Sequence, residues 1–169
     1  MRRKRIVLVL FLIVACVGCD QVTKEIARSH LPKTKTLSYA GDMLRLDYTE
    51  NRGGVLSFEC CLPEIFRGSI LTAAVSAFLG LLFLCLLFVS GLWPLSVVGL
   101  SLIFGGSLSN LLDRIALGGD VVDFLSVGWG GLRTAIFNVA DALIVIGASL
   151  LVISVVWNLG VSALSRPTR

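Results

Sequence analysis

The stretch from Ser69 to Ser90, SILTAAVSAFLGLLFLCLLFVS, contains no charged residue over a length that can cross a lipid bilayer. A spanning helix needs about 20 consecutive, mostly apolar residues. Similar stretches occur at about residues 6–22, 94–112 and 136–159. Hydrophobic residues make up 56% of the chain. Charged residues make up 15%, whereas about a quarter of the residues in a typical soluble domain are charged. The sequence therefore predicts an all-α membrane protein with four transmembrane helices, and it excludes an ordinary water-soluble domain.

The orientation in the membrane is predicted from the basic residues at the N-terminus. Four cationic residues, Arg2 to Arg5, precede the first apolar stretch, and such clusters stay in the cytoplasm. Four crossings then place both termini in the cytoplasm and leave two segments, at about residues 25–67 and 114–133, on the outer side of the membrane. All 11 acidic residues fall on or near that outer side, so we expect any chemistry to be there.

A small extracytoplasmic β-structure is predicted in the first outer segment. Apolar Leu44, Leu46 and Tyr48 alternate with polar residues, which is typical of a half-buried strand. Residues 51–54, Asn-Arg-Gly-Gly, are typical of a turn, and residues 55–58 resume an extended apolar run. This pattern favours a hairpin. The sequence shows no sign of a soluble domain beside the membrane helices, so we expect residues 1–169 to form a single membrane domain.

Ionisable and amide side chains near a membrane interior are costly, and each is a functional hypothesis by default. Asn110, Asp113 and Arg114 share one face at the outer end of the third predicted helix. Asn138 and Asp141 are three residues apart at the outer start of the fourth, and the segment between the two helices contains Asp123 among apolar neighbours, in the run VVDF.

Structural roles could explain part of this pattern. Asp113 and Arg114 could form an ion pair, and Asn138 could cap a helix whose first turn favours the charge of Asp141. Small residues recur every four positions in the third helix and are typical of helix packing, at Ser101, Gly105 and Ser109. None of these roles explains why Asp123 and Asp141 both reach the same membrane boundary.

Two carboxyl groups within hydrogen-bond reach share a proton, so one acts as a base and the other as an acid. A water molecule between them can be deprotonated by one aspartate while it attacks a peptide carbonyl. The other aspartate protonates the carbonyl oxygen and helps the amine to leave. This chemistry requires no metal and no cofactor, and we expect neither.

Five short motifs appear in a fixed order along most of the chain: Asp20-Gln21-x-Thr23-Lys24, Asn51-x-Gly53 before Ser57-Phe58, Gly105-Gly106-x3-Asn110-x2-Asp113-Arg114, Val122-Asp123-Phe124 and Phe137-Asn138-x-Ala140-Asp141. Together they resemble the motifs of the lipoprotein signal peptidases, or signal peptidase II, which are aspartic membrane proteases of bacteria. The chain departs from that pattern at Gly54-Val55-Leu56, where the family usually has Ala-Ala-Phe, at Ser109 in place of glycine, and at Ala142 in place of serine.

The resemblance implies a four-helix fold with a small β-structure, and removal of signal peptides from diacylglyceryl-modified prolipoproteins by cleavage N-terminal to the lipidated cysteine. It implies that Asp123 and Asp141 are catalytic. It further implies substrate-orienting or supporting roles for Asn110, Arg114, Asn138, Asn51, Asp113, Asp20 and Lys24. The implied partners are the prolipoprotein substrate and membrane lipids, without nucleic acid or an obligate protein partner. The implied location is the bacterial inner membrane, with the active site at its outer face.

Four other interpretations remain. Residues 13–16, Ile-Val-Ala-Cys, resemble the cleavage site of a lipoprotein signal peptide, but three more apolar spans follow, so we expect Cys16 to lie in an uncleaved helix. A non-enzymatic proton or ion relay could use Asp113, Asp123 and Asp141. A cysteine hydrolase could pair His30 with Cys60 or Cys61. A catalytically degenerate relative would keep the fold and lose the activity.

Overall fold

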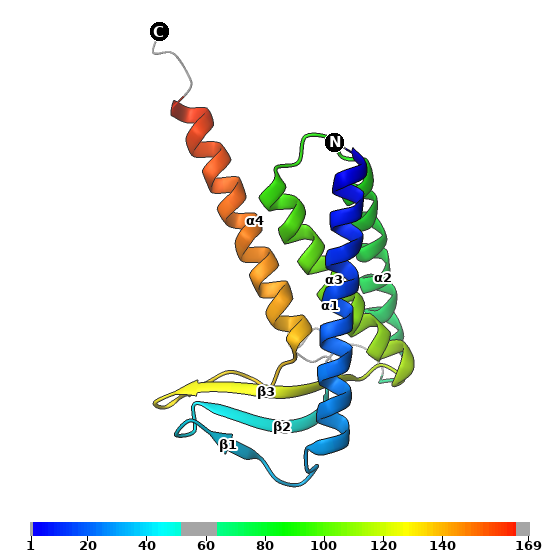
Figure 1. Cartoon of the computed structure of the whole chain (residues 1–169). Helices are drawn as coiled ribbons and strands as arrows, with labels where there is room; N and C mark the ends of the chain where they lie inside the picture. The colour runs from blue at the N-terminus through cyan, green and yellow to red at the C-terminus, as the bar shows by residue number, and fades with distance from the viewer. Residues whose placement is uncertain (1, 52–63, 165–169) are drawn as a thin grey trace.

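The computed structural model describes residues 2–51 and 64–164. The helices are α1 (Arg2–His30), α2 (Glu64–Phe88), α3 (Pro94–Ala116) and α4 (Val139–Leu164). The strands are β1 (Leu37–Tyr39), β2 (Leu44–Asn51), β3 (Val121–Trp129) and β4 (Leu132–Arg133). Figure 1 shows the sheet lying across one end of the helical bundle, while the start of α1, the α2–α3 connection and the end of α4 lie at the other end.

The apolar helices fit a membrane protein. In the part of the chain that the structure describes, three helical segments are long and apolar enough to span a bilayer: Arg3–His30, Pro94–Ala116 and Val139–Val161. The apolar part of α2 counted there, Thr72–Phe88, is shorter. The prediction of a mostly helical membrane protein with a small β-structure is thus confirmed, whereas three of the four predicted spans are found among the described residues.

The helix ends differ from those predicted by hydropathy. Helix α1 continues past residue 22 to His30 because residues 22–30 contain no glycine or proline, and its last turns pack on the sheet through Ala27. Helix α4 begins at Val139 and not at residue 136, because the backbone of Phe137 pairs with Leu125 of β3. The remaining ends also extend or shift by a few residues, at Glu64 and Phe88 of α2, Ala116 of α3 and Leu164 of α4.

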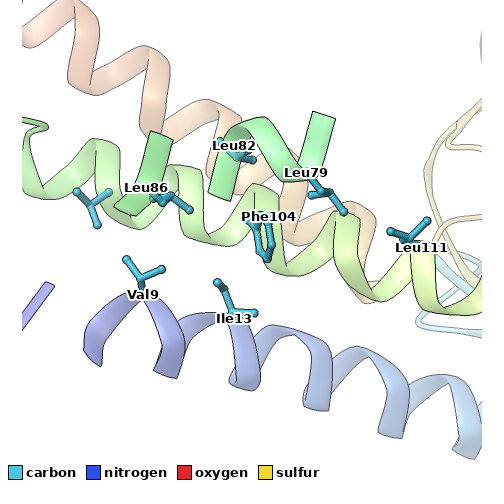
Figure 2. Close-up of a cluster of buried hydrophobic side chains, with 8 residues drawn as sticks. Val9, Ile13, Leu79, Leu82, Leu86, Phe104 and Leu111 are labelled. Atoms are coloured by element: carbon cyan, nitrogen blue, oxygen red, sulfur yellow. The ribbon is translucent and has the colours of Figure 1, made fainter. Parts of the chain in front are cut away.

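A hydrophobic seam joins the first three helices. Figure 2 shows buried apolar side chains from all three elements turned toward one another: Val9 and Ile13 of α1, Leu79, Leu82 and Leu86 of α2, and Phe104 and Leu111 of α3. The rings of Phe83 and Phe104 pack with their centroids 5.6 Å apart. The cluster extends from Val9 near the start of α1 to Leu111 near the end of α3, so it joins the three helices along much of the bundle.

Helices α3 and α4 approach each other through glycines. A Cβ atom placed on Gly99 would lie 2.6 Å from the Gly147 carbonyl oxygen, and one on Gly106 would lie 2.6 Å from the Ala140 carbonyl oxygen. A buried hydrogen bond of 2.8 Å between the Ser96 and Ser154 hydroxyls joins the same pair of helices. The close contact at Gly106 sets the position of the first turn of α4, which contains Asp141.

Adding one methyl group at Gly106 should disturb this contact. We expect Gly106→Ala to lower the free energy of unfolding by about 1–3 kcal/mol, because the added carbon meets backbone that cannot move aside. The matched control is Gly80→Ala in α2, where nothing lies within 4 Å of the added carbon. Thermal unfolding in detergent compares the two variants, and equal unfolding temperatures would contradict the packing argument.

The four strands form one antiparallel sheet in the order β1-β2-β3-β4. The predicted strand at Leu44 to Thr49 is confirmed as part of β2, whose described neighbours are β1 and β3. The second arm of the predicted hairpin, residues 55–58, lies outside the described residues. Strand β3 was not predicted, and its pairing with β2 places Asp123 opposite Thr49.

A second apolar cluster fixes β3 against the end of α1. It consists of Ala27, Tyr48, Val122 and Phe124. Because successive side chains of a strand point to opposite faces, burying Val122 and Phe124 in this cluster turns Asp123 to the other face. That face is where Asp123 meets Asn138 at the start of α4.

Candidate active site

The polar residues singled out by the sequence converge where the helical bundle meets the sheet. Most of them are almost fully buried: Asp20, Lys24, Asn110, Asp113, Asp123 and Asn138. They come from α1, α3, β3 and the residue that precedes α4, so segments far apart in the sequence share this site. Asn51 and Asp141 join the same network and are partly exposed.

Asp141 and Asn138 form a reciprocal cap at the start of α4. The Asp141 backbone N–H donates to Asn138 Oδ1 at 2.9 Å, and the Asn138 backbone N–H donates to Asp141 Oδ2 at 3.2 Å. This is the geometry of a capping box, which satisfies two helix N–H groups at once. The structural role that the sequence allowed for these residues is therefore present, and it holds the Asp141 carboxyl group in a fixed direction.

Asp123 is 3% exposed and accepts a hydrogen bond on each carboxyl oxygen. Asn138 Nδ2 donates to Oδ1 at 2.7 Å, and Asn51 Nδ2 donates to Oδ2 at 3.0 Å. Burial raises the pKa of Asp123 above its ordinary value of 3.8; the hydrogen bond from Asn51 opposes this rise, and the charge of Asp141 adds to it. The charge of Asp141 thus influences the protonation of Asp123.

Asn110 connects the two aspartates. Its Nδ2 donates to Asp141 Oδ1 at 2.9 Å, and its Oδ1 accepts from Asn138 Nδ2 at 3.1 Å. The same Oδ1 accepts from Lys24 Nζ at 2.8 Å. Because an ammonium group can only donate, Lys24 requires the oxygen of the Asn110 amide on its side and leaves the nitrogen facing Asp141. A chain of amides thus runs from Asp123 through Asn138 and Asn110 to Asp141.

Lys24 is the centre of a buried ionic cluster. Besides Asn110, its Nζ contacts Asp20 Oδ2 at 2.7 Å and Asp113 Oδ2 at 2.8 Å, so all three ammonium hydrogens have acceptors. Asp20 Oδ1 accepts the Ala140 backbone N–H at 2.7 Å, and Asp113 Oδ2 accepts the Val122 backbone N–H at 3.1 Å. Each of these amides belongs to the residue just before one of the two aspartates. The cluster therefore fixes the backbone that carries both Asp123 and Asp141.

Two residues of this network were not predicted as site residues. The Ser109 hydroxyl donates to Asp20 Oδ2 at 2.8 Å, and Gln21 Nε2 donates to Asp113 Oδ1 at 2.8 Å and approaches Ser109 Oγ at 3.0 Å. The spacing contained a signal, because Ser109 lies four residues before Asp113 on the same helix face. Arg114 is half-buried in the last turn of α3, and its carbonyl accepts the Gly119 N–H at 2.8 Å.

Sequence comparisons identify relatives of this chain. Residues 12–157 match a family model described as "Signal peptidase (SPase) II". A lipoprotein signal peptidase of Syntrophus aciditrophicus is 35% identical over 153 residues, covering 88% of this chain and 93% of the relative. The lipoprotein signal peptidase of Chlorobium phaeobacteroides is 37% identical over 144 residues, covering 79% of this chain and 86% of the relative.

Two solved structures have a similar fold. One described as "Bacterial membrane enzyme structure by the in meso method at 1.9 A resolution" superposes with a TM-score of 0.75 and 26% identity, covering 95% of this chain and 94% of the other. A second bacterial membrane enzyme structure, at 2.3 Å resolution, has the same TM-score with 25% identity. The family match, the relatives and the membrane helices together show that this chain belongs to the signal peptidase II family and is a membrane peptidase.

Proposed function

We propose that this chain is an aspartic endopeptidase that removes signal peptides from diacylglyceryl-modified prolipoproteins by cleaving N-terminal to the lipidated cysteine. Family membership supports the substrate class. The observation that supports the mechanism is the buried connection of Asp123 and Asp141 through Asn138 and Asn110. Two carboxyl groups coupled in this way are suited to hold a single proton between them.

In the proposed mechanism Asp141 is the base and Asp123 is the acid. Asp141 accepts a backbone N–H at the start of α4, where the helix dipole favours negative charge, and it is partly exposed. Asp123 is buried, and burial favours its protonated form. The different surroundings of the two carboxyl groups thus assign them different roles.

Proton transfers then balance over one reaction cycle. Asp141 removes a proton from water as its oxygen attacks the peptide carbonyl carbon, and Asp123 donates its proton to the carbonyl oxygen, which gives a gem-diol. When the C–N bond breaks, Asp141 gives its proton to the leaving amine and one diol hydroxyl returns a proton to Asp123. Arg114 and Asn51 are the proposed contacts for the substrate backbone, since Arg114 offers a planar set of donors to carbonyl oxygens.

The site also suits a lipidated substrate. Each acyl methylene kept in the bilayer is worth about 0.8 kcal/mol, so a diacylglyceryl cysteine holds its peptide bond at the membrane surface. We place the whole chain in the inner membrane as one protease domain with α2 as the fourth span and both termini in the cytoplasm. In that orientation the end of the bundle that carries the sheet faces the outer surface (Figure 1), and Asp123 and Asp141, which Asn138 and Asn110 connect, lie at this end.

A cleavage assay tests this function. The purified chain in detergent is given a prolipoprotein in its diacylglyceryl-modified form and the same polypeptide without lipid, and mass spectrometry locates the cut. We expect cleavage N-terminal to the cysteine in the lipidated substrate and at least about a tenfold lower rate without lipid. Equal rates would contradict the proposed substrate class. No cleavage of either form would favour the ion relay.

A further inference from the structure

A cavity of about 600 Å³ lies at the end of the bundle opposite Asp123, between the start of α1, the end of α2 and the start of α3. Apolar side chains form most of its wall, including Leu8, Leu87, Phe88 and Val97. Arg5 is the cationic residue in that lining. The proposed peptidase reaction has no use for this cavity.

Arg5 is held in place by the end of α2. Its Nη1 donates to the Val89 carbonyl at 2.7 Å, and its Nη2 donates to the Leu86 carbonyl at 2.6 Å. These carbonyls lie at a helix C-terminus, where a cation is favoured. The guanidinium group is therefore a fixed positive charge beside an apolar cavity. Arg3 and Lys4, both exposed, add two cations in the same turn of α1.

The cavity lies where lipid headgroups meet acyl chains. The apolar stretch of α1 begins directly after Arg5, so the cations mark the boundary of the hydrocarbon. The α2–α3 connection carries Trp93, which is 48% exposed, and exposed tryptophans are enriched at the headgroup level. From this level the wall continues through Leu8 toward Val97, that is, into the acyl region.

We propose that this cavity binds an anionic phospholipid of the leaflet facing the N-terminus. An acyl chain fills the apolar space, and the phosphate is attracted by Arg5, Arg3 and Lys4. Charge complementarity favours an anionic headgroup, because each basic residue near the membrane surface raises the affinity for anionic lipid by about fivefold. This site is separate from the proposed peptidase site and depends on none of its residues.

A second groove, on α4, provides an internal control. Its volume is about 520 Å³, and its described lining carries no charge: Val152, Ile153, Val156, Trp157, Gly160 and Val161. Its lining residues belong to the second half of α4, and the end of α4 lies at the same end of the bundle as the start of α1 (Figure 1). If apolar volume alone retained lipid, both grooves would do so without regard to the headgroup.

Native mass spectrometry of the full chain tests the proposal with phosphatidylglycerol and phosphatidylcholine of identical acyl chains. We expect one phosphatidylglycerol to be retained preferentially. The double variant Arg3→Gln with Lys4→Gln should lower its affinity by about fivefold per charge and leave phosphatidylcholine unchanged. Leu8→Trp should lower retention of both lipids by filling the cavity from a position that is 41% exposed.

The matched control is Gly160→Trp, which fills the α4 groove at a site with nothing within 4 Å of an added Cβ atom. It should leave phosphatidylglycerol retention unchanged. Equal retention of the two lipids by the wild type would overturn the proposal. So would retention that survives Leu8→Trp or falls equally with Gly160→Trp. The unfolding temperature of each variant in detergent reports intact folding, so this control does not depend on the proposed function.

Discussion

Asp123→Asn and Asp141→Asn should each lower kcat/KM for a lipidated prolipoprotein by about 10²- to 10⁴-fold, which is the usual contribution of a positioned acid or base. In Asp141→Asn the water molecule loses the group that accepts its proton. In Asp123→Asn the carbonyl oxygen loses its proton donor. Both substitutions conserve side-chain volume, so the loss should fall on kcat more than on KM.

These variants also disturb hydrogen bonds to a similar extent. Each aspartate accepts one donor on each oxygen, and an amide can satisfy only one of the two, at a cost of about 1–3 kcal/mol in stability. Measured unfolding temperatures separate this effect from the loss of chemistry. The control Asp42→Asn changes an exposed carboxyl group that pairs with Arg45 and Arg133, and it should leave kcat/KM unchanged. Full activity in either Asp123→Asn or Asp141→Asn would contradict the dyad.

Lys24→Met should lower the free energy of unfolding by about 3–5 kcal/mol, since it leaves Asp20 and Asp113 as uncompensated buried charges. It should also lower activity, because both carboxylates hold backbone amides next to Asp141 and Asp123. Without the ammonium group, the Asn110 amide is no longer forced to present its nitrogen to Asp141. Thermal unfolding and cleavage rates measure the two effects.

A matched control for Lys24 is Lys35→Met, which removes the same charge from an exposed position. Exposed substitutions of this kind change stability by about 0.5 kcal/mol or less. The double variant Lys24→Met with Asp113→Asn should lose less stability than the two single changes added together, because the residues contact each other. A Lys24→Met protein as stable as Lys35→Met would show that the cluster does not hold the site together.

The sequence predicted the helical membrane fold because apolar length is a direct consequence of the bilayer thickness. Hydropathy locates the bilayer rather than the helix, and it therefore missed the last turns of α1, where Ala27 packs on the sheet. Strand β3 was missed for a related reason. It is buried on both faces over residues 121–124 and so lacks the alternation that identifies a strand.

The candidate site was predictable as a set of residues but not as a network. Asn138 and Asp141 were weighed either as a helix cap or as site residues, and the structure has the cap within the site. The spacing of Asp20 and Lys24 favours an ion pair within one helix. Asp113, the third residue of the buried ionic cluster around Lys24, lies on α3, and only the packing of α1 against α3 brings it to Lys24. The spacing of Ser109 and Asp113 places both on one face of α3, but the partners of Ser109 and Gln21 could not be assigned, because each lies on the other helix.

In the proposed mechanism Asp123 and Asp141 hold one proton, which resides on Asp123. Infrared spectroscopy of the carboxylic acid C=O stretch during a pH titration measures this directly. Because the pKa of Asp123 is raised by burial and by the charge of Asp141, the acid form persists above the ordinary value of 3.8 and is lost as pH rises through the raised pKa. We expect this band to be absent in Asp123→Asn and to titrate at lower pH in Asp141→Asn. A wild-type band that neither substitution changes would contradict the shared proton.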